Sequence, residues 1–272
     1  MEHEVTLRRN ATTLHLDLDH GGRATRFEIG DLSLLAHVDP DSPFHWGSFV
    51  MAPWAGRIRN GMFAVDGEEY ALPINWDPHA IHGTVLDRSW RLLEATDDMA
   101  VLECELDDRW PWDGRVRQTV RLGDGTADFR IEVHTDGVPF PASTGWHPWF
   151  SRRLGRGEAA EIELDAEAML RRDDADIATT ERIPVPPEPW DDCFDGVRWP
   201  VRLTWPHALV LEVAGDTRYA VVYTEMAEAV CVEPQTGPPD ALNLEPLMVT
   251  PDRPLTATMT WTWRQPGGSV GS

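Results

Sequence analysis

Cysteine is scarce in this sequence. Only three of its 272 residues are cysteines, at Cys104, Cys193 and Cys231. An odd, sparse set of this kind does not form a disulfide framework. None of the three has a partner at the CxxC spacing that structural zinc sites use. We therefore expect neither a disulfide scaffold nor a structural zinc site.

Long apolar runs are also missing. No stretch approaches the roughly 20 consecutive apolar residues that a membrane-spanning helix requires. The first ten residues, MEHEVTLRRN, lack the apolar core of a secretory signal. Both absences predict a cytoplasmic protein.

Basic residues are few compared with acidic ones. The chain has 24 Lys and Arg against 46 Asp and Glu, which gives a net charge of -22. Nucleic acids and anionic membranes carry negative charge and would be repelled by such a surface. We therefore expect no nucleic-acid or membrane partner, whereas a neutral small molecule remains compatible with this charge.

Helical periodicity is rare, and alternation of apolar and polar residues takes its place. Residues 255–263 alternate Leu, Ala, Met and Trp with threonine, which indicates a strand with one buried face. Residues 116–133 form two alternating runs around the turn signal GDGT. Residues 64–70 and 208–223 indicate two further hairpins, and residues 158–172 favour strand over helix.

Short strands separated by frequent turns are typical of a sandwich of sheets. The chain has 22 prolines and 21 glycines, and 42% of its residues are hydrophobic, enough for a substantial core. The prediction is an all-β protein, a large antiparallel β-sandwich. Because no linker or repeat is visible, residues 1–266 are expected to form one domain, followed by a flexible tail over 267–272.

Several catalytic signatures are absent. The sequence has no GxSxG nucleophile motif, no phosphate-binding loop and no GxGxxG that opens a helix. Chemistry must therefore be sought in four other short stretches.

The first stretch, APWAGRIRNG over residues 52–61, places Arg57 and Arg59 among small and turn residues. A guanidinium is a rigid fork of donors for a carboxylate, a phosphate or a pair of hydroxyls. A surface loop with solvated arginines is an equal alternative.

The second stretch, HAIHG, separates His79 from His82 by three residues and places Gly83 after them. Without a third ligand nearby this spacing does not indicate a metal. The glycine indicates a tight turn that presents the His82 imidazole, and a hydrogen-bonded core histidine is the competing interpretation.

The third stretch, GWHPWF, packs His147 among three aromatic residues and a proline. Such surroundings disfavour the imidazolium and lower the pKa of histidine. Histidine is also the side chain best suited to exchange protons near neutral pH. A core histidine is again the alternative.

The fourth stretch, CVEPQTGPPDALN over residues 231–243, places Glu233 directly after the apolar run AVCV. Burial there raises the pKa of a glutamate toward the range useful to a general base. Upstream, Asp191 and Asp192 offer further carboxylates. Two histidines, a glutamate, an arginine and an aspartate together suit proton transfer on a polyhydroxylated substrate.

Taken together, the four stretches resemble the aldose 1-epimerase (mutarotase) family of the galactose mutarotase-like superfamily. They occur in the family's order and spread over most of the chain, as APWAGRIRNGMF, IHGTVLDRSW, GWHPWF and CVEPQTGPPDALN. The family commonly has a residue such as asparagine where this chain has Gly56. The resemblance implies a large antiparallel β-sandwich, in agreement with the alternation. It also implies a small-molecule sugar substrate and an acid–base reaction that needs no metal or redox cofactor.

The resemblance also implies roles for single residues. Glu233 falls on the general base, His147 on the general acid and His82 on the second active-site histidine. Arg57, rather than Arg59, falls on the substrate-binding arginine. Asp191, with Asp192 adjacent, falls on the aspartate that binds sugar hydroxyls. The chain has 13 tryptophans, and most of them are expected in the core. One or more of Trp54, Trp146 and Trp149 are predicted to stack on the sugar.

Three other functions remain as alternatives. A hexose-6-phosphate 1-epimerase would need a cationic pocket. The arginines that could supply one are Arg57, Arg59, Arg88, Arg152 and Arg153. A non-catalytic carbohydrate-binding protein would not need an acid–base pair. A metal-dependent β-sandwich enzyme would use His82, His147 and Glu233 as ligands, and it ranks last because no compact ligand motif is present. The sequence leaves the sugar and the oligomeric state open.

Overall fold

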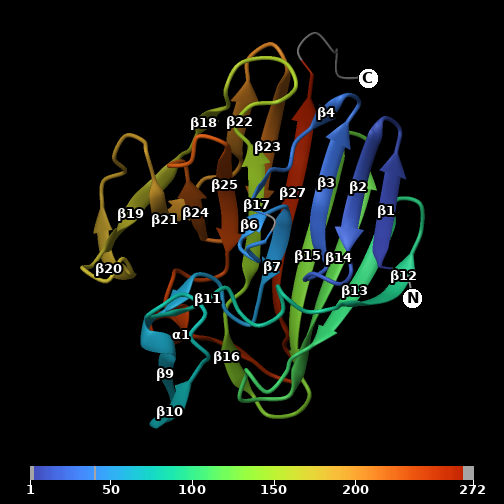
Figure 1. Ribbon diagram of the computed structural model, residues 1–272. Coiled ribbons are helices and arrows are strands. Elements are labelled where there is room, and N and C mark those ends of the chain that lie inside the picture. Colours follow the sequence, from blue (N-terminus) through green and yellow to red (C-terminus); the bar gives the residue numbers. More distant parts are fainter. Residues whose placement is uncertain (1–2, 40, 266–272) are drawn as a thin grey trace.

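The computed structural model describes residues 3–39 and 41–265, and it is built almost entirely from antiparallel strands (Figure 1). Within those residues an eleven-stranded sheet runs in the order β1-β2-β3-β7-β17-β25-β24-β21-β19-β20, and β4 adds to β3. Its strands are β1 (Glu4–Arg9), β2 (Thr12–Asp17), β3 (Arg23–Ile29), β4 (Leu32–Ser33), β7 (Ser48–Met51), β17 (Gly145–Ser151), β19 (Ala166–Arg172), β20 (Ala178–Ile183), β21 (Asp191–Val197), β24 (Tyr219–Tyr223) and β25 (Ala229–Gln235).

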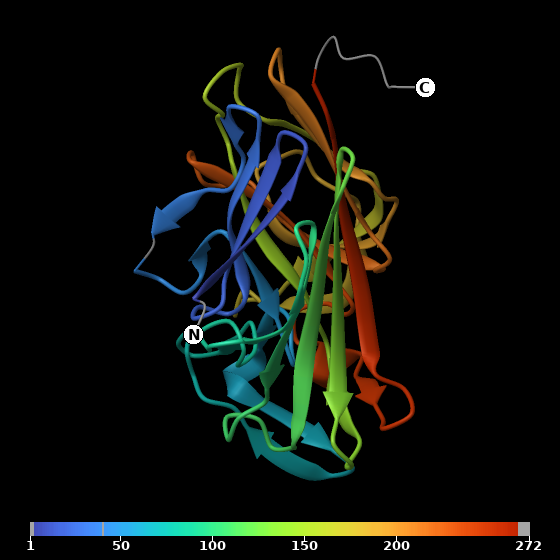
Figure 2. The same cartoon turned by 90° about the vertical axis from the view of Figure 1, so that its right-hand side faces the viewer.

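A second sheet, of eight strands among the described residues, runs in the order β12-β13-β14-β15-β27-β23-β22-β18. Its strands are β12 (Arg91–Ala95), β13 (Met99–Glu105), β14 (Gly114–Gly123), β15 (Thr126–Thr135), β18 (Glu161–Glu163), β22 (Val201–Trp205), β23 (Leu209–Gly215) and β27 (Leu255–Arg264). The two sheets form the layers of a sandwich (Figure 2), which confirms the predicted all-β fold.

Small elements complete the chain. Four two-stranded pairs lie outside the large sheets: β5 (His37–Asp39) with β6 (His45–Trp46), β8 (Arg57–Ile58) with β11 (Ala80–Ile81), β9 (Met62–Val65) with β10 (Glu68–Ala71), and β16 (Phe140–Ala142) with β26 (Leu247–Val249). The helical elements of the described residues are η1 (Arg59–Gly61) and α1 (Ala241–Leu244). The pair β9–β10, β11 and α1 gather at one end of the sandwich, at the bottom of Figure 1.

The core lies between the two layers. Phe27 of β3 and Phe150 of β17 both pack on Trp261 of β27, with ring centroids 5.1 and 5.2 Å apart. Trp261 is fully buried together with Ala257 and Met259. The alternation in β27 therefore predicted its buried face correctly. Among the described residues no helix is long and apolar enough to cross a membrane.

The predicted hairpins had mixed outcomes. The hairpin over residues 116–133 is β14 paired with β15, and the one over residues 64–70 is β9 paired with β10. Residues 158–172 contain β18 and β19, as expected for strand. The prediction of a hairpin over residues 208–223 is wrong. Its two strands belong to different sheets, because β23 pairs with β22 and β27 whereas β24 pairs with β21 and β25. The turn between them crosses the sandwich. The tail predicted over residues 267–272 lies outside the described residues.

Candidate active site

One face of the first sheet brings the polar residues of distant segments together. In the pairing of β17 with β25, Gly145 lies opposite Gln235 and Trp149 opposite Cys231. His147 lies midway between the two β17 positions, so this register sets it opposite Glu233. Side chains two residues apart point to the same face of a strand. His147 and Glu233 therefore project from neighbouring strands toward the same side.

The other face of these strands belongs to the core. Trp146 and Phe150 alternate with His147 along β17, and both are fully buried against the second sheet. The Trp146 indole donates a hydrogen bond from Nε1 to Gln118 Oε1 at 3.2 Å. The period of two thus decides which residues of GWHPWF can meet a ligand.

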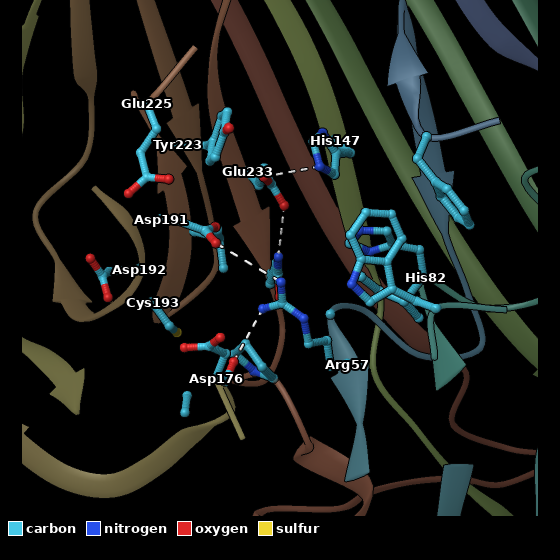
Figure 3. Close-up of a pocket in the computed structure, with 18 of the residues that line it drawn as sticks. Arg57, His82, His147, Asp176, Asp191, Asp192, Cys193, Tyr223, Glu225 and Glu233 are labelled. Atoms are coloured by element: carbon cyan, nitrogen blue, oxygen red, sulfur yellow. Dashed lines mark hydrogen bonds and ion pairs between the residues drawn. The ribbon is translucent and has the colours of Figure 1, made fainter. Parts of the chain in front are cut away.

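Glu233 and His147 form a buried pair (Figure 3). The His147 Nε2 atom lies 3.3 Å from Glu233 Oε1, and Gln235 Nε2 donates a hydrogen bond to Glu233 Oε2 at 3.1 Å. Glu233 is only 2% exposed. Burial, reinforced by the nearby charge of Asp191, raises the pKa of Glu233 well above the ordinary carboxylate value, although Gln235 and Arg57 oppose the shift.

His147 is held between aromatic rings. Its imidazole stacks on Phe49 and Trp149, with centroids 4.9 and 5.0 Å apart. Burial, reinforced by the nearby charge of His45, lowers the pKa of His147 to about 3. Its Nδ1 atom is buried without a hydrogen-bond partner among the described residues. The imidazole therefore exchanges protons through Nε2, the atom that faces Glu233.

His82 sits in a turn that only glycine can follow. It adopts a left-handed backbone conformation with φ of 60°, and Gly83 follows with φ of 80°. A Cβ atom at Gly83 would lie 1.9 Å from the carbonyl oxygen of Ala52, so no other residue fits without moving the backbone. The turn sets the His82 ring 5.1 Å from the His147 ring.

The His82 imidazole is buried and has no side-chain hydrogen-bond partner among the described residues. Within residues 3–39 and 41–265 it makes no side-chain hydrogen bond, and its Nδ1 atom is buried without a partner. Burial, with a smaller contribution from His147, lowers the pKa of His82 well below the ordinary value. A neutral imidazole at this position can donate a hydrogen bond to a ligand or accept one.

Arg57 and Asp191 face each other across the opening (Figure 3). Arg57 Nη1 donates to the carbonyl oxygen of Asp176 at 3.2 Å, and its Nη2 lies 3.9 Å from Asp191 Oδ2. Arg172 contacts the neighbouring carboxylates Asp191 and Asp192. Its Nη1 lies 3.5 Å from Asp191 Oδ2, and its Nε lies 3.1 Å from Asp192 Oδ1. Burial raises the pKa of Asp191, and Arg57 and Arg172 oppose the shift.

The structure distinguishes Arg57 from Arg59 as the arginine of the cavity, but it does not distinguish Asp191 from Asp192. Arg59 lies outside the cavity and pairs with Asp173 at 2.5 Å and Asp240 at 3.9 Å. Of the two arginines, only Arg57 lines the cavity. Asp191 and Asp192 both line it, although Asp192 is the more buried of the two.

A cavity of about 230 Å³ joins these residues. Its size is near the lower limit of small-molecule sites, roughly 300 Å³. The residues that line it are Phe44, His45, Gly56, Arg57, Trp76, Ile81, His82, His147, Trp149, Arg172, Asp176, Ala178, Asp191, Asp192, Cys193, Val221, Tyr223, Glu225, Met226, Glu233, Gln235 and Pro239. One part of the wall is aromatic and another part is rich in carboxylates, so the cavity suits a small ligand with both apolar faces and polar groups.

Two of the predicted stacking residues need correction. Trp54 and Trp146 are each 1% exposed and neither lines the cavity. Trp54 instead stacks on Trp110 in the core, with centroids 5.8 Å apart. Trp149 lines the cavity as predicted, and Trp76 joins it with 39% of its surface exposed.

Sequence reasoning missed several residues of the cavity wall. They are His45, Trp76, Arg172, Tyr223 and Glu225. Each comes from a segment without a distinctive motif, and Trp76 is one of 13 tryptophans. The sequence signal among them is Trp76, an aromatic residue in NWDP, whose asparagine, aspartate and proline are typical of a loop.

Gly56 stands where the aldose 1-epimerase family commonly has a residue such as asparagine. Its φ of 68° is left-handed, and its carbonyl oxygen accepts a hydrogen bond from the His82 amide at 3.1 Å. A Cβ atom there would lie 3.0 Å from the Cα of Pro239, which also lines the cavity. Pro239 thus occupies the space that a side chain at position 56 would need.

The histidines considered as metal ligands do not lie together in one group. His79 accepts a hydrogen bond from the Asn60 amide at its Nδ1 atom, 3.1 Å away, so it serves the loop and does not join His82. The group of ligand-type side chains that converges among the described residues is His147, Cys231 and Glu233, whose ligand atoms all lie within 4.8 Å of one another. His82 is not part of that group.

Comparisons with known proteins identify a matching family model, related sequences and a similar fold. A family model described as aldose 1-epimerase matches residues 4–265. The uncharacterized protein YihR of Escherichia coli (strain K12) is 24% identical over 234 residues, which cover 77% of this chain and 76% of that protein. Galactose mutarotase of Sus scrofa is 27% identical over 176 residues, 61% of this chain and 50% of that protein. The solved structure of an aldose epimerase homologue from C. elegans has the same fold, with a TM-score of 0.81, 15% identity and coverage of 96% and 98%.

Proposed function

The chain belongs to the aldose 1-epimerase family, and from this premise we propose that it interconverts the α and β anomers of a free aldose by acid–base opening and closure of the sugar ring. The observation that supports this most directly is the buried pair of His147 and Glu233, 3.3 Å apart at the wall of a small cavity. A protein that only binds carbohydrate has no need for such a pair.

Ring opening requires two proton transfers. Glu233 takes the proton of the C1 hydroxyl, and the electrons of that bond form the C1 carbonyl. The C1–O5 bond breaks, and O5 takes the proton of His147 Nε2. O1 and O5 are both bonded to C1, so a hemiacetal can present both oxygens to the two closely spaced groups. Each positioned transfer can supply roughly 10²–10⁴-fold in rate.

Burial assists these transfers. In the form of the pair that opens the ring, Glu233 is a carboxylate and His147 an imidazolium; afterwards both are neutral. A site that raises the pKa of Glu233 and lowers the pKa of His147 favours the neutral forms. Opening thus moves the pair in the direction that its surroundings favour. The aldehyde then rotates about C1–C2 and closes on its other face, with the roles reversed.

Other residues of the cavity hold the sugar. His82 donates a hydrogen bond to the C1 oxygen and stabilises the charge that develops there. Arg57 and Asp191 bind sugar hydroxyls. Trp149 and Trp76 replace Trp146 and Trp54 as surfaces on which the apolar face of the ring packs.

Polarimetry tests the proposal. Freshly dissolved α-anomers of several aldoses should reach equilibrium faster with the protein than without it. A chain that binds these sugars in calorimetry but accelerates none of them is a carbohydrate-binding protein, and the proposal fails.

Removal of the exposed indole should weaken sugar binding more than catalysis. We expect Trp76→Ala to raise KM by up to about tenfold with little change in kcat, because an aromatic contact contributes roughly 0.5–1.5 kcal/mol and does not take part in proton transfer. Ile74→Ala is the matched control, since Ile74 is also exposed in the same loop but does not line the cavity. Unchanged KM in Trp76→Ala would contradict the stacking role.

The pH dependence should follow the single proton that the pair shares. Burial lowers the pKa of His147 to about 3 and raises the pKa of Glu233. The pair therefore holds one proton from about pH 3 up to the raised pKa of Glu233. Above it His147 has no proton for the ring oxygen, so kcat/KM should fall.

A pH–rate profile, corrected for the spontaneous reaction, measures this dependence. A profile that rises through the usual carboxylate range and stays high in alkali would mean that Glu233 acts as a simple base, without the shared proton.

The charge of the cavity disfavours a phosphorylated sugar. Its wall carries five carboxylate residues and only two arginines. The carboxylates are Asp176, Asp191, Asp192, Glu225 and Glu233, and the arginines are Arg57 and Arg172. The other arginines proposed for a phosphate site lie elsewhere: Arg88 pairs with Asp107, and Arg152 donates to backbone carbonyls of residues 224 and 226.

We therefore expect kcat/KM for a hexose 6-phosphate to be at least about tenfold lower than for the free hexose, because like charges repel in a partly buried site. Glu225→Gln should narrow this ratio, whereas Glu228→Gln, an exposed neighbour outside the cavity, should not. Faster turnover of the phosphorylated sugar would favour the hexose-6-phosphate alternative.

A further inference from the structure

A buried thiol lies beside the acid–base pair. Cys231 precedes Glu233 by two residues on β25, so both side chains project from the same face, and its register partner on β17 is Trp149. The ligand atoms of His147, Cys231 and Glu233 all lie within 4.8 Å of one another, and all three residues are buried. Within the described part of the chain Cys231 is a free cysteine that forms no disulfide. The reaction proposed above gives Cys231 no role.

The three side chains are the three ligand types that Zn²⁺ uses. An imidazole nitrogen, a thiolate sulfur and a carboxylate oxygen bind the ion at roughly 2.0–2.3 Å, which places tetrahedral ligands roughly 3.3–3.6 Å apart. The 3.3 Å between His147 Nε2 and Glu233 Oε1 already matches such an edge. The Cys231 sulfur lies within 4.8 Å of both other ligand atoms. To complete a third corner it would have to approach them by up to roughly 1.5 Å.

The surroundings leave a path for entry and a fourth position. His147 and Glu233 line the cavity, whereas Cys231 lies behind them in an apolar cluster with Phe49 and Trp149. An ion that entered through the cavity would meet the histidine and the carboxylate first. Its fourth corner would point back into the cavity, where a water molecule can bind.

We propose that His147, Cys231 and Glu233 form a binding site for a thiophilic divalent cation such as Zn²⁺, and that the bound ion inhibits the enzyme. Binding displaces the Cys231 thiol proton and the proton shared by the pair, both of which pass to solvent. The acid and the base are then both ligands and cannot serve the sugar. Binding of the ion stands on the geometry alone, whereas inhibition also rests on the proposed function.

Cobalt is the direct probe of the site. Reduced protein titrated with Co²⁺ should develop the near-ultraviolet charge-transfer band of a cobalt thiolate. The band should disappear in Cys231→Ala and in the closer mimic Cys231→Ser. Cys193→Ala is the matched control, because Cys193 is another buried thiol at the cavity but is not part of the ligand group. It should keep the band. Circular dichroism verifies that each variant is folded.

Zinc tests the functional half. Zn²⁺ should raise the apparent KM for the sugar in the wild type and in Cys193→Ala, because ion and sugar compete for the same groups. Cys231→Ala should turn over sugar normally without metal and should require at least about tenfold more Zn²⁺ for the same inhibition, since one of three protein ligands is lost. Mg²⁺, which prefers oxygen ligands, should not inhibit.

Distinct outcomes overturn distinct claims. Absence of the cobalt band in folded wild-type protein, or a band that persists in both Cys231 variants, would overturn the site. Equal zinc binding by wild type and Cys231→Ala would assign the ion to the acidic surface and overturn it too. If the band appears but no aldose is converted, the site stands and the proposed function fails.

Discussion

Replacing Glu233 with glutamine is expected to lower kcat by about 10²-fold or more. The amide has nearly the same shape but cannot accept the C1 proton at neutral pH, so the reaction loses its general base. The contact with Gln235 can persist, because one oxygen remains at position 233 to accept its hydrogen bond. The measurement is the rate of anomer equilibration at matched protein concentration, after subtraction of the spontaneous rate.

The stability of this variant provides an independent check. A raised pKa in the folded state means that ionised Glu233 opposes folding increasingly as the pH rises above the pKa of an unfolded glutamate. The neutral glutamine removes that cost. Glu233→Gln should therefore unfold at the same temperature as the wild type or higher at neutral pH, while its activity falls. Near wild-type mutarotation of the best sugar would make Glu233 a structural residue and would contradict its assignment as the base.

Replacing His147 with asparagine should lower kcat by a similar factor, about 10²-fold or more, because O5 loses the acid that protonates it as the C1–O5 bond breaks. Asparagine keeps a polar group beside Glu233 but has no proton to exchange near neutral pH. It also gives up the ring stacking on Phe49 and Trp149. Thermal unfolding must accompany the kinetics, so that lost packing is separated from lost catalysis.

A buried histidine outside the cavity provides the matched control for this variant. His79 is also buried, but it bonds to the loop at Asn60 and does not line the cavity. His79→Asn should keep most of the activity. Equal losses in the two variants would show that His147 serves packing, and the acid would have to be sought elsewhere.

The double variant distinguishes a concerted pair from two independent groups. His147 and Glu233 act on the same ring-opening event across 3.3 Å. Glu233→Gln combined with His147→Asn should therefore lose less than the product of the two single losses. Losses that multiply would mean that the two groups act in separate steps.

The alternation of residues determined much of the fold without help from the structure. Ala257, Met259 and Trp261 were predicted on one face of a strand, and they lie on the buried face of β27. A strand's two faces differ over a few neighbouring residues, so local sequence is enough to show them. The four polar stretches were likewise visible as sequence, and the structure places Arg57, His82, His147 and Glu233 at one cavity.

The hairpins β14–β15 and β9–β10 were visible in the sequence, but only the tertiary structure decided how the other strands pair. The runs in β23 and β24 alternate as a hairpin would, yet they pair in different sheets. Both sheets present an apolar face to the same core, so the pattern cannot distinguish one partner from another. Register between distant strands is set by the packing of the whole sandwich. That register puts His147 opposite Glu233.

Tertiary structure also decided which buried residues face the ligand. Every residue of β25 is buried, so its sequence carries no difference between the core side and the cavity side. The same ambiguity misplaced Trp146, which lies one residue from His147 and therefore on the opposite face of β17. Trp76 and Glu225 reach the cavity from loops, and Arg172 reaches it from the end of β19. Their place depends on contacts between segments far apart in the chain, which no local pattern records.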